Sequence, residues 1–470
     1  MANEAETKME AVENEELEYN PAPVQTEILK RETIPFRPIQ ATYDTTIQFD
    51  VDNQRYGKYI DPANITLEVE VGIRKKSDNS VLEKGKKVAP INIPLHSMFK
   101  NVTTTLNGTV INESNGTYPY TAYIQTTMSK EKEFLATQGE LMLWQKDDED
   151  SMSTTPATAT SVQYEAEQAI DFENKTVRAA VESNALALRQ GRWFDNAPEA
   201  DGTVIEAYHP VTLIGRPIGP LFQQDRYLPY GINMVIQLDR ADNNFVLMNG
   251  EVNEYELRIE KIQLFVDYVT INQQVFQNDL NRKTNIVIPV TRPAVKTYTM
   301  YTGCNGETFT LFSGKLPKRL ILGYVANSAF HGKKDENPFN FQSFNINKLY
   351  VQRNGENCPF RPFEPDFNKK QYKREYMSIF DALGILNENG SVPISYDEFG
   401  GGFAFFCFDF TGEGKNGMLD ENTKHLLDQG IMTVENSFSS ALTSSVNLVA
   451  YAEFETDITI DPKGNVDKGF

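Results

Sequence analysis

The stretch GEGKNG at 412–417 is the part of the chain that most resembles a catalytic motif. It follows the apolar run FAFFCFDF and precedes a possible helix at 419–428, and Glu435 ends the next strand-like run. This is the outline of a dinucleotide fingerprint, in which a pyrophosphate binds at the N-terminus of a helix. Asp420 and Glu421 would lie in the first turn of that helix and repel the phosphates. We therefore predict a glycine-rich surface loop rather than a cofactor site.

The other residue types that support catalysis form no pattern. His96, His209, His331 and His425 each stand alone, without the spacing of metal ligands. The glycines at 400–402 are best interpreted as a flexible connection into a strand. The 65 acidic residues allow too many carboxylate pairs for a glycosidase pair to be identified. We predict no catalytic, cofactor-binding or metal site, and no enzyme activity.

The cysteines, Cys304, Cys358 and Cys407, are few and widely spaced, so we expect free thiols in a reducing compartment. Residues 1–32 lack an apolar run, which predicts that the chain has no secretory signal. No stretch approaches the ~20 continuous apolar residues of a membrane span. We therefore attribute the Asn-x-Ser/Thr sequons to turn and strand composition rather than to glycosylation. They begin at Asn64, Asn101, Asn107, Asn112, Asn115, Asn174 and Asn389.

Length and composition predict two β-rich domains. A chain of 470 residues is too long for one ordinary core and suits two domains of about 200 residues each. Hydrophobic residues make up 40% and aromatic residues 11%. Phe, Tyr, Val, Ile and Thr are common, and these side chains favour strands over helices.

The net charge of −20 argues against strong direct binding of nucleic acid, because phosphate binding requires clustered Lys and Arg. Basic clusters at 74–76, 84–87 and 369–374 are short and interrupted. We interpret them as solvated loops and one helix face. Local contact with nucleic acid or with a neighbouring subunit is the alternative.

Residues 1–32 are Glu-rich and are expected to form a disordered or loosely attached arm. The ordered fold should begin near Ile34, with a first domain over 33–272 that contains a long loop excursion at 145–205. Asn107-Gly108 between two strand-like runs predicts a hairpin with a type I′ turn. In this half we predict a helix at 118–129 and strands at 43–51, 65–73, 102–106, 109–111, 211–214, 232–238 and 255–271.

The second domain is predicted over 273–470. It should contain a helix at 369–386 and strands at 286–290, 295–301, 319–325, 346–351, 403–410, 431–434 and 446–460. Short, closely spaced strands with turn signals between them are typical of an all-β sandwich.

The two halves repeat one series of features. A Ser-containing segment leads into a strand, an Asn-Gly pair, a stretch rich in Pro and aromatic residues, and a helix. The Asn-Gly pairs are Asn107-Gly108 and Asn354-Gly355, and each half ends on a long apolar strand. The repetition favours two copies of one β fold.

The sequence also resembles the hexon-type major capsid proteins of adintoviruses and of the Maverick/Polinton virus-like transposons of animals. The arm at 1–32 and the excursion at 145–205 lie outside the resemblance. The stretches that carry it are YIDPANITLEVEV (59–71), VAPINIPLHSMFKNVTTTLNGTVI (88–111), NGTYPYTAYIQTTMS (115–129), LFQQDRYLPYGINMVIQL (221–238), KLPKRLILGYVANSAFHGKKDENPFNF (315–341) and VNLVAYAEFETDITIDPKGNV (446–466).

The resemblance implies two tandem jelly-roll β-sandwiches, a double jelly roll, with short helices in the inter-strand loops. It also implies a homotrimeric, pseudo-hexagonal capsomer that tiles an icosahedral shell around a double-stranded DNA genome. The expected partners are other copies of the chain and penton or minor capsid proteins, with no cofactor and no small-molecule substrate. The expected location is the virion, after synthesis without a secretory signal and with assembly in the nucleus as one option.

Two alternatives remain open. The chain could keep this fold but serve as a minor capsid component, or as a domesticated transposon-derived binding protein. It could also be a β-sandwich carbohydrate-binding protein or glycosidase. Only Trp144 and Trp193 are available for an aromatic sugar platform, which disfavours the last alternative.

Overall fold

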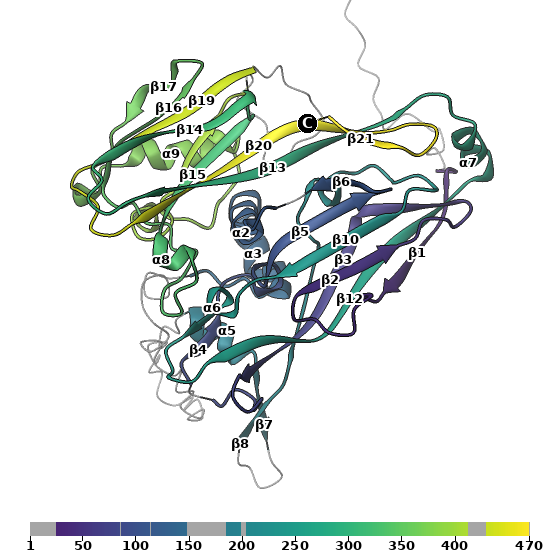
Figure 1. Ribbon diagram of the computed structural model, residues 1–470, viewed down its shortest axis with the longest axis horizontal. Helices are drawn as coiled ribbons and strands as arrows, with labels where there is room; N and C mark the ends of the chain where they lie inside the picture. The colour runs from purple at the N-terminus through teal and green to yellow at the C-terminus, as the bar shows by residue number, and fades with distance from the viewer. Residues whose placement is uncertain are drawn as a thin grey trace, which may run out of the picture.

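Figure 1 shows the computed structural model of the chain as two β-sandwiches that pack against each other. The structure describes residues 25–84, 86–112, 114–147, 185–198, 204–411 and 429–469. Within these ranges, no helix combines the length and the apolar character needed to cross a membrane.

Eight strands of the first half form two four-stranded sheets. One sheet has the order first, eighth, third, sixth along the chain, and the other has the order second, seventh, fourth, fifth. All neighbouring strands in both sheets are antiparallel. In chain order the eight strands are β1 (Ile28–Phe36), β2 (Thr46–Val51), β3 (Lys58–Lys75), β5 (Phe99–Leu106), β6 (Thr109–Asn112), β9 (Val211–Gly215), β10 (Met234–Arg240) and β12 (Tyr255–Ile271).

The second half repeats this topology. Its two sheets again have the orders first, eighth, third, sixth and second, seventh, fourth, fifth. This is the arrangement of an eight-stranded jelly roll, so the two copies of one β fold predicted from the sequence are confirmed. The strands are β13 (Ile286–Met300), β14 (Gly306–Lys315), β15 (Arg319–Ala326), β16 (Ile346–Arg353), β17 (Glu356–Phe363), β18 (Phe406–Asp409), β19 (Gln429–Phe438) and β20 (Val446–Ile460).

Shorter elements decorate this frame. In the first half, β4 pairs with β11, and β7 pairs with β8 in a separate hairpin. In the second half, β21 adds to the end of β20. Their bounds are β4 (Val88–Pro90), β7 (Phe194–Pro198), β8 (Val204–Tyr208), β11 (Leu247–Asn249) and β21 (Val466–Lys468).

Short helices occupy the connections between strands, as predicted for the fold. The helix predicted at 118–129 is present with those bounds. The helices are α1 (Pro94–Ser97), α2 (Tyr118–Ser129), α3 (Lys132–Thr137), α5 (Ala185–Gly191), α6 (Asn243–Val246), α7 (Gln273–Leu280), α8 (Asn327–Phe330), α9 (Lys373–Ala382) and α10 (Tyr396–Phe399), with 3₁₀ turns η2 (Gln138–Met142), η3 (Pro220–Gln223) and η4 (Phe367–Lys369).

Equivalent Asn-Gly turns close one hairpin in each half. Asn107 and Gly108 have φ of 44° and 86° between β5 and β6, and Asn354 and Gly355 have φ of 54° and 86° between β16 and β17. Positive φ at both central positions matches the two strands' twist. The hairpin predicted at Asn107-Gly108 is confirmed, and its counterpart lies at the equivalent position of the second half.

Several predicted boundaries were wrong. β1 begins at Ile28, ahead of the expected start near Ile34, because it pairs with β12 as far as Ile271. The strands predicted at 286–290 and 295–301 form the single strand β13, which pairs with β20 along its whole length. The prolines of β13 are tolerated because it is the edge strand of its sheet.

The predicted helix at 369–386 is shorter in the structure. Lys370 has φ of 52°, which separates the 3₁₀ turn η4 from α9. The predicted strand at 403–410 is reduced to β18. The edge strands β14 and β17 were not predicted, since most of their residues are exposed or only partly buried and show no clear apolar alternation.

The excursion predicted at 145–205 is fixed to the first jelly roll at both of its described ends. Asp147, near its start, is buried, and α5 and the β7–β8 hairpin lie toward its end. Trp193 is fully buried and its Nε1 donates a hydrogen bond to the Val71 carbonyl at 3.1 Å. Residues 148–184 and 199–203 lie outside the described residues.

Helix α2 lies at the junction between the two jelly rolls (Figure 1). All of its residues except Ser129 are buried. Tyr123 stacks on Phe339 of the second half with ring centroids 4.2 Å apart. In the other direction, Ile288 of β13 and Ile458 of β20 pack into the core of the first half. The two jelly rolls therefore share core residues across their junction.

Candidate functional site

The histidines do not gather into a site. His96 is buried, and its Nδ1 lies 3.0 Å from the Tyr118 hydroxyl. Burial lowers the pKa of His96 to about 4, so the ring is neutral at pH 7. His209 and His331 contact backbone carbonyls of Pro210 and Asn327, and His425 lies outside the described residues. No group of three metal-ligating side chains occurs in the described ranges.

The other motifs also separate in space. Gly400 follows α10, and residues 402 and 403 form bridges to Phe341, as a connection into a strand would. Residues 412–428, with the glycine-rich motif, lie outside the described part of the chain. Glu435 accepts a hydrogen bond from the Tyr350 hydroxyl on the surface of a sheet.

The three cysteines have free thiols, as predicted. Burial raises the pKa of the Cys407 thiol to about 12, so this thiol is unreactive at neutral pH. Both tryptophans are buried, with Trp144 7% exposed and Trp193 fully enclosed. Neither tryptophan can therefore form an exposed platform for a sugar ring, as the carbohydrate-binding alternative would require.

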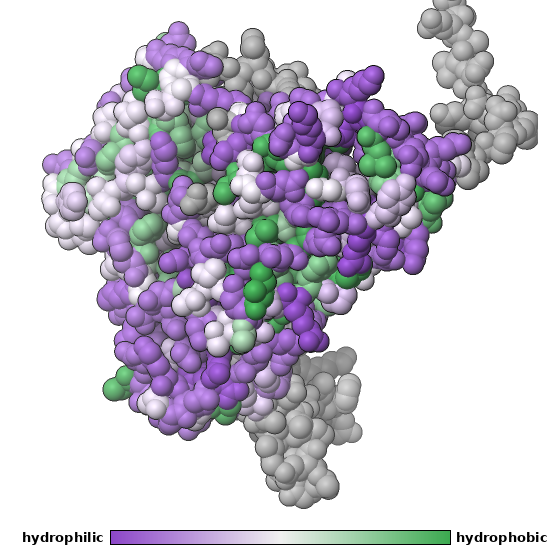
Figure 2. Space-filling model, turned by 45° about the vertical axis from the view of Figure 1, so that its right-hand side comes forward, coloured by the Kyte–Doolittle hydropathy of each residue, from purple (hydrophilic) through white to green (hydrophobic). Residues whose placement is uncertain are grey.

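Several residues of the basic clusters form ion pairs with nearby carboxylates. In the first cluster Arg74 pairs with Glu260 at 2.8 Å, and Lys76 pairs with Glu254 at 3.1 Å. In the last cluster Lys369 pairs with Asp366 at 2.8 Å. The space-filling view shows a largely hydrophilic face with scattered apolar residues (Figure 2). These observations agree with the interpretation of the clusters as solvated surface.

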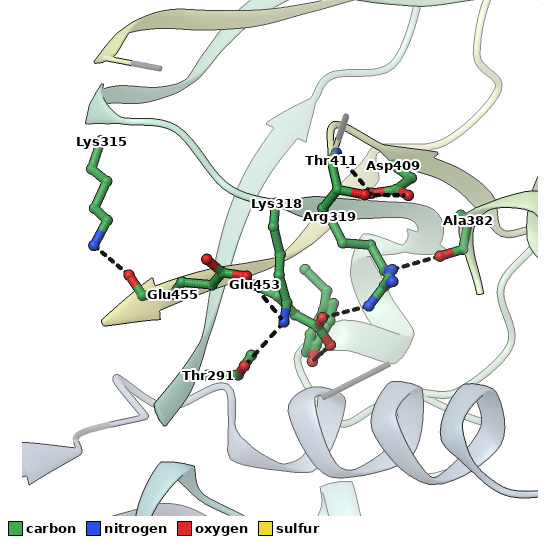
Figure 3. Close-up of polar contacts among 10 residues, drawn as sticks. Thr291, Lys315, Lys318, Arg319, Ala382, Asp409, Thr411, Glu453 and Glu455 are labelled. Atoms are coloured by element: carbon green, nitrogen blue, oxygen red, sulfur yellow. Dashed lines mark hydrogen bonds and ion pairs between the residues drawn. The ribbon is translucent and has the colours of Figure 1, made fainter. Parts of the chain in front are cut away.

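Buried charges concentrate at the junction between the jelly rolls, where Figure 3 shows them at the start of β15 and on β20. Arg319 Nη1 lies 2.8 Å from Glu453 Oε2, and both side chains are almost fully buried. Arg319 Nε also donates to the carbonyl of Ala382 at 2.6 Å, at the C-terminal end of α9. The Arg319 guanidinium is therefore attracted both by the Glu453 carboxylate and by the negative end of the α9 helix dipole.

A hydrogen-bond chain extends this pair into the first jelly roll. Tyr451 donates its hydroxyl proton to Glu453 Oε1 at 2.9 Å, and its oxygen accepts from Gln125 Nε2 of α2 at 2.9 Å. Gln223 then donates to Gln125 Oε1 at 3.1 Å. Burial and the neighbouring Glu453 raise the pKa of Tyr451 well above its usual value. The chain joins the halves through neutral hydroxyl and amide groups.

A second cation lies next to this network. Lys318 Nζ is 3.1 Å from Thr291 Oγ1 and 3.7 Å from Glu455 Oε1 (Figure 3). Lys318 and Arg319 thus face two carboxylates that alternate along β20, Glu453 and Glu455. Buried charges of this kind require complete hydrogen bonding, because desolvation of each ion costs several kcal/mol.

The first jelly roll has its own buried pair, Arg189 and Asp147. Arg189 Nη2 lies 2.7 Å from Asp147 Oδ1, and neither side chain is exposed. Arg189 also donates to the carbonyls of Pro90 and Gln145 at 2.9 and 3.2 Å. The pair closes the base of the excursion by joining residues on either side of 148–184.

Sequence reasoning missed both buried pairs. A signal was present, because Lys318-Arg319 and Glu453 interrupt the apolar strands β15 and β20. The charges of each pair are 134 and 42 residues apart along the chain, so only the folded sheet brings them together. The charges of both pairs are enclosed, and each lies within hydrogen-bonding distance of its partner.

Comparison with known proteins supports the architecture. The chain is 24% identical to the uncharacterized protein F54H12.2 of Caenorhabditis elegans over 394 residues, which cover 82% of each chain. No protein-family model matches it. Among solved structures, a chain of the Sputnik virophage superposes with a TM-score of 0.61 and 13% identity, and covers 98% of this chain and 92% of its own.

Two further structures agree. The mavirus major capsid protein has a TM-score of 0.52 and 12% identity, over 100% of this chain and 97% of its own. The Faustovirus major capsid protein has a TM-score of 0.51 and 10% identity, over 94% and 92%. This chain is a double jelly roll. The fold class predicted from the sequence is therefore confirmed along nearly the whole chain.

Proposed function

We propose that this double jelly-roll protein is the major capsid protein of a virus or virus-like element. The observation that carries the proposal is the repetition of one strand order in two jelly rolls of one chain. Three copies would present six similar lobes, which is the shape of a pseudo-hexagonal tile. Such a homotrimer would pack into an icosahedral shell around a double-stranded DNA genome.

The stretches that resemble adintovirus and Maverick/Polinton proteins support this origin in particular. The partners would be neighbouring capsomers and penton or minor capsid proteins, and the location would be the virion. Assembly in the nucleus after synthesis without a secretory signal fits that life cycle. A structural role without enzyme activity or cofactor agrees with the dispersal of the histidines and with the enclosed charge pairs.

We assign the boundary between the jelly rolls to residues 272 and 273. There β12 ends and α7 begins, before β13 opens the second sandwich. The first jelly roll would then span 28–272 and the second 273–470. Because β1 begins at Ile28, we place the end of the acidic arm at residue 27 instead of residue 32.

Native mass measurement and electron microscopy of the purified full chain test the proposal. We expect a species of three times 53.2 kDa or larger, with hexagonal outlines or closed shells in the images. A persistent monomer at high protein concentration and physiological salt would contradict it.

A second candidate is a domesticated, transposon-derived protein or a minor capsid component with the same fold. The relative in Caenorhabditis elegans favours it, since an animal carries a protein of similar length. Neighbouring genes distinguish the two, because a packaging ATPase and a protein-primed polymerase accompany a complete virus-like element.

A further inference from the structure

Two open cavities of about 560 and 480 Å³ lie beside each other, the first lined by residues of both jelly rolls and the second by residues of the first jelly roll alone. They share Ile218 and lie along helix α2, whose first turns line one cavity and whose last turns line the other. We call the two cavities together the basic groove. Its cations are Arg292, Lys296 and Lys315 in the first cavity, and Lys130 and Arg216 in the second.

The basic groove is distinguished by its charge. Among the described residues that line it there is no Asp or Glu, although the whole chain has 65 acidic and 45 basic residues. Five cations beside two cavities therefore create a local positive potential on an acidic protein.

Four of these cations take part in none of the ion pairs found within the described ranges. Lys130 lies over the Phe134 ring at 5.0 Å and Lys296 over the Phe312 ring at 4.8 Å. Lys315 donates to a backbone carbonyl. Burial and the nearby Arg216 both lower the pKa of Lys130, so bringing an anion into the groove would relieve repulsion there.

The chain itself contains a segment of the opposite charge. Residues 1–24 include seven Glu and a single Lys. The described chain begins just after them, where Asn272 donates hydrogen bonds to the carbonyls of Thr26 at 3.2 Å and Glu27 at 2.7 Å. This point lies next to α7, at the same end of the molecule as the start of β13 (Figure 1).

The distance from that point to the groove is within reach. Arg292 lies six residues along β13 from Ile286, which corresponds to about 20 Å of strand. An extended segment of 24 residues spans at most about 80 Å. The second cavity lies farther along α2, whose 12 residues span about 18 Å. The sum of these lengths is well below the reach of the acidic segment, which can therefore extend to both cavities of its own subunit.

We propose that the Glu-rich residues 1–24 bind in the basic groove of the same subunit. Their carboxylates pair with the amines of Lys296 and Lys315 in one cavity and Lys130 in the other. A phosphate polyanion such as DNA is the less favoured occupant, because the net charge of −20 opposes its approach. This inference does not depend on the capsid role.

Zero-length carbodiimide cross-linking of the full chain, followed by peptide mass spectrometry, tests the proposal. The reagent joins a carboxylate to an amine only when the two are in contact. We expect links from Glu residues of 1–24 to Lys296, Lys315 and Lys130. In a mixture of ¹⁵N-labelled and unlabelled protein these links should lie within one chain.

Charge reversal provides the matched comparison. In the variant Lys296→Glu/Lys315→Glu, links to Lys130 should fall roughly tenfold, because attraction becomes repulsion at two positions. The control Lys76→Glu/Lys261→Glu reverses two exposed lysines outside the groove and should leave the links unchanged. Thermal denaturation of each variant verifies that it is folded.

Three results would overturn the proposal. The first is links that spread evenly over exposed lysines of the whole surface. The second is links only between different copies. The third is a pair of acetylation results. Short double-stranded DNA protects the groove lysines from acetylation, whereas deletion of residues 1–24 leaves the acetylation of these lysines unchanged.

Discussion

The two jelly rolls have the same strand order but different surroundings. In the first, the central strand β12 alternates between buried and more accessible residues along most of its length. In the second, its counterpart β20 is buried at every position from Val446 to Phe454 and alternates only beyond that. Helix α2 of the first half covers part of the second, which turns an ordinary outer face into an interior.

The two jelly rolls therefore share a strand order but differ in how much of each sheet is enclosed. An outer face can carry polar side chains freely, whereas an enclosed face must pair each of them. Arg319, Glu453 and Tyr451 are among the buried polar groups of the second jelly roll. The following experiments test that contrast, from the largest expected effect to the smallest.

The largest effect is expected from breaking the buried pair. Glu453→Ala should destabilise the protein by about 3–5 kcal/mol, because it leaves the Arg319 guanidinium buried without its counter-charge. Chemical denaturation measures the free energy of unfolding. The double variant Arg319→Met/Glu453→Leu should recover most of the loss. A double variant as unstable as the single one would show that the pairing is not the cause.

Acid should weaken the first jelly roll through His96. Its folded pKa of about 4 lies below the value of about 6.5 for an unfolded histidine. The unfolded state therefore binds the proton first, and stability should fall by about 3 kcal/mol as the pH drops from 6.5 to 4. His96→Gln should remove this part of the pH dependence, as followed by denaturation at several pH values.

Hydrogen exchange provides the control for this experiment, because it follows each jelly roll separately. It should show earlier acid loosening in the first jelly roll than in the second. Equal loosening of both would contradict the assignment to His96.

Removal of one hydroxyl tests the link between the halves. Tyr451→Phe leaves the buried Nε2 of Gln125 without its acceptor, and should cost about 1–3 kcal/mol. Tyr301→Phe, at a side chain that is 73% exposed, should change stability very little. If the two variants behaved alike in thermal denaturation, the hydrogen-bond chain would contribute nothing to the junction.

The smallest effect is expected at the matching turns. Gly108→Ala and Gly355→Ala should each cost about 1–2 kcal/mol, because φ is 86° at both positions and a Cβ is disfavoured there. No atom lies within 4 Å of the added Cβ in either turn, so the cost is conformational. Gly191→Ala, in helix α5 with equally open space, should be neutral or stabilising. Very different costs at the two turns would break their equivalence.

Much of the fold follows from local patterns. Alternation of apolar residues located β3, β12 and β20, and the helix at 118–129 was predicted with its observed bounds. The edge strands β14 and β17 escaped prediction because a strand with one neighbour buries too little to show a clear pattern. The sequence predicted two strands where the structure has the single strand β13. Its continuity depends on pairing with β20, which the prolines within β13 do not indicate.

The functional surfaces were harder to predict. No metal or cofactor site is predicted from the sequence, and neither the buried pairs nor the basic groove could be identified from it. The lysines of the groove are Lys130 directly after α2, Lys296 in β13 and Lys315 at the end of β14, and no spacing along the chain connects them. Their clustering depends on how the halves dock, which is a property of two surfaces and not of any one segment.

The sequence by itself determined the alternation of apolar residues, the Asn-Gly turns and the repeated series of elements that make two β-sandwiches. These are local matters, because a side chain's alternation and a turn's φ depend on near neighbours along the chain. Only the tertiary structure decided that β20 is enclosed, that Arg319 meets Glu453, and that five cations share one groove. Those contacts join residues far apart in sequence, and sheet register and helix docking alone bring them within hydrogen-bonding distance.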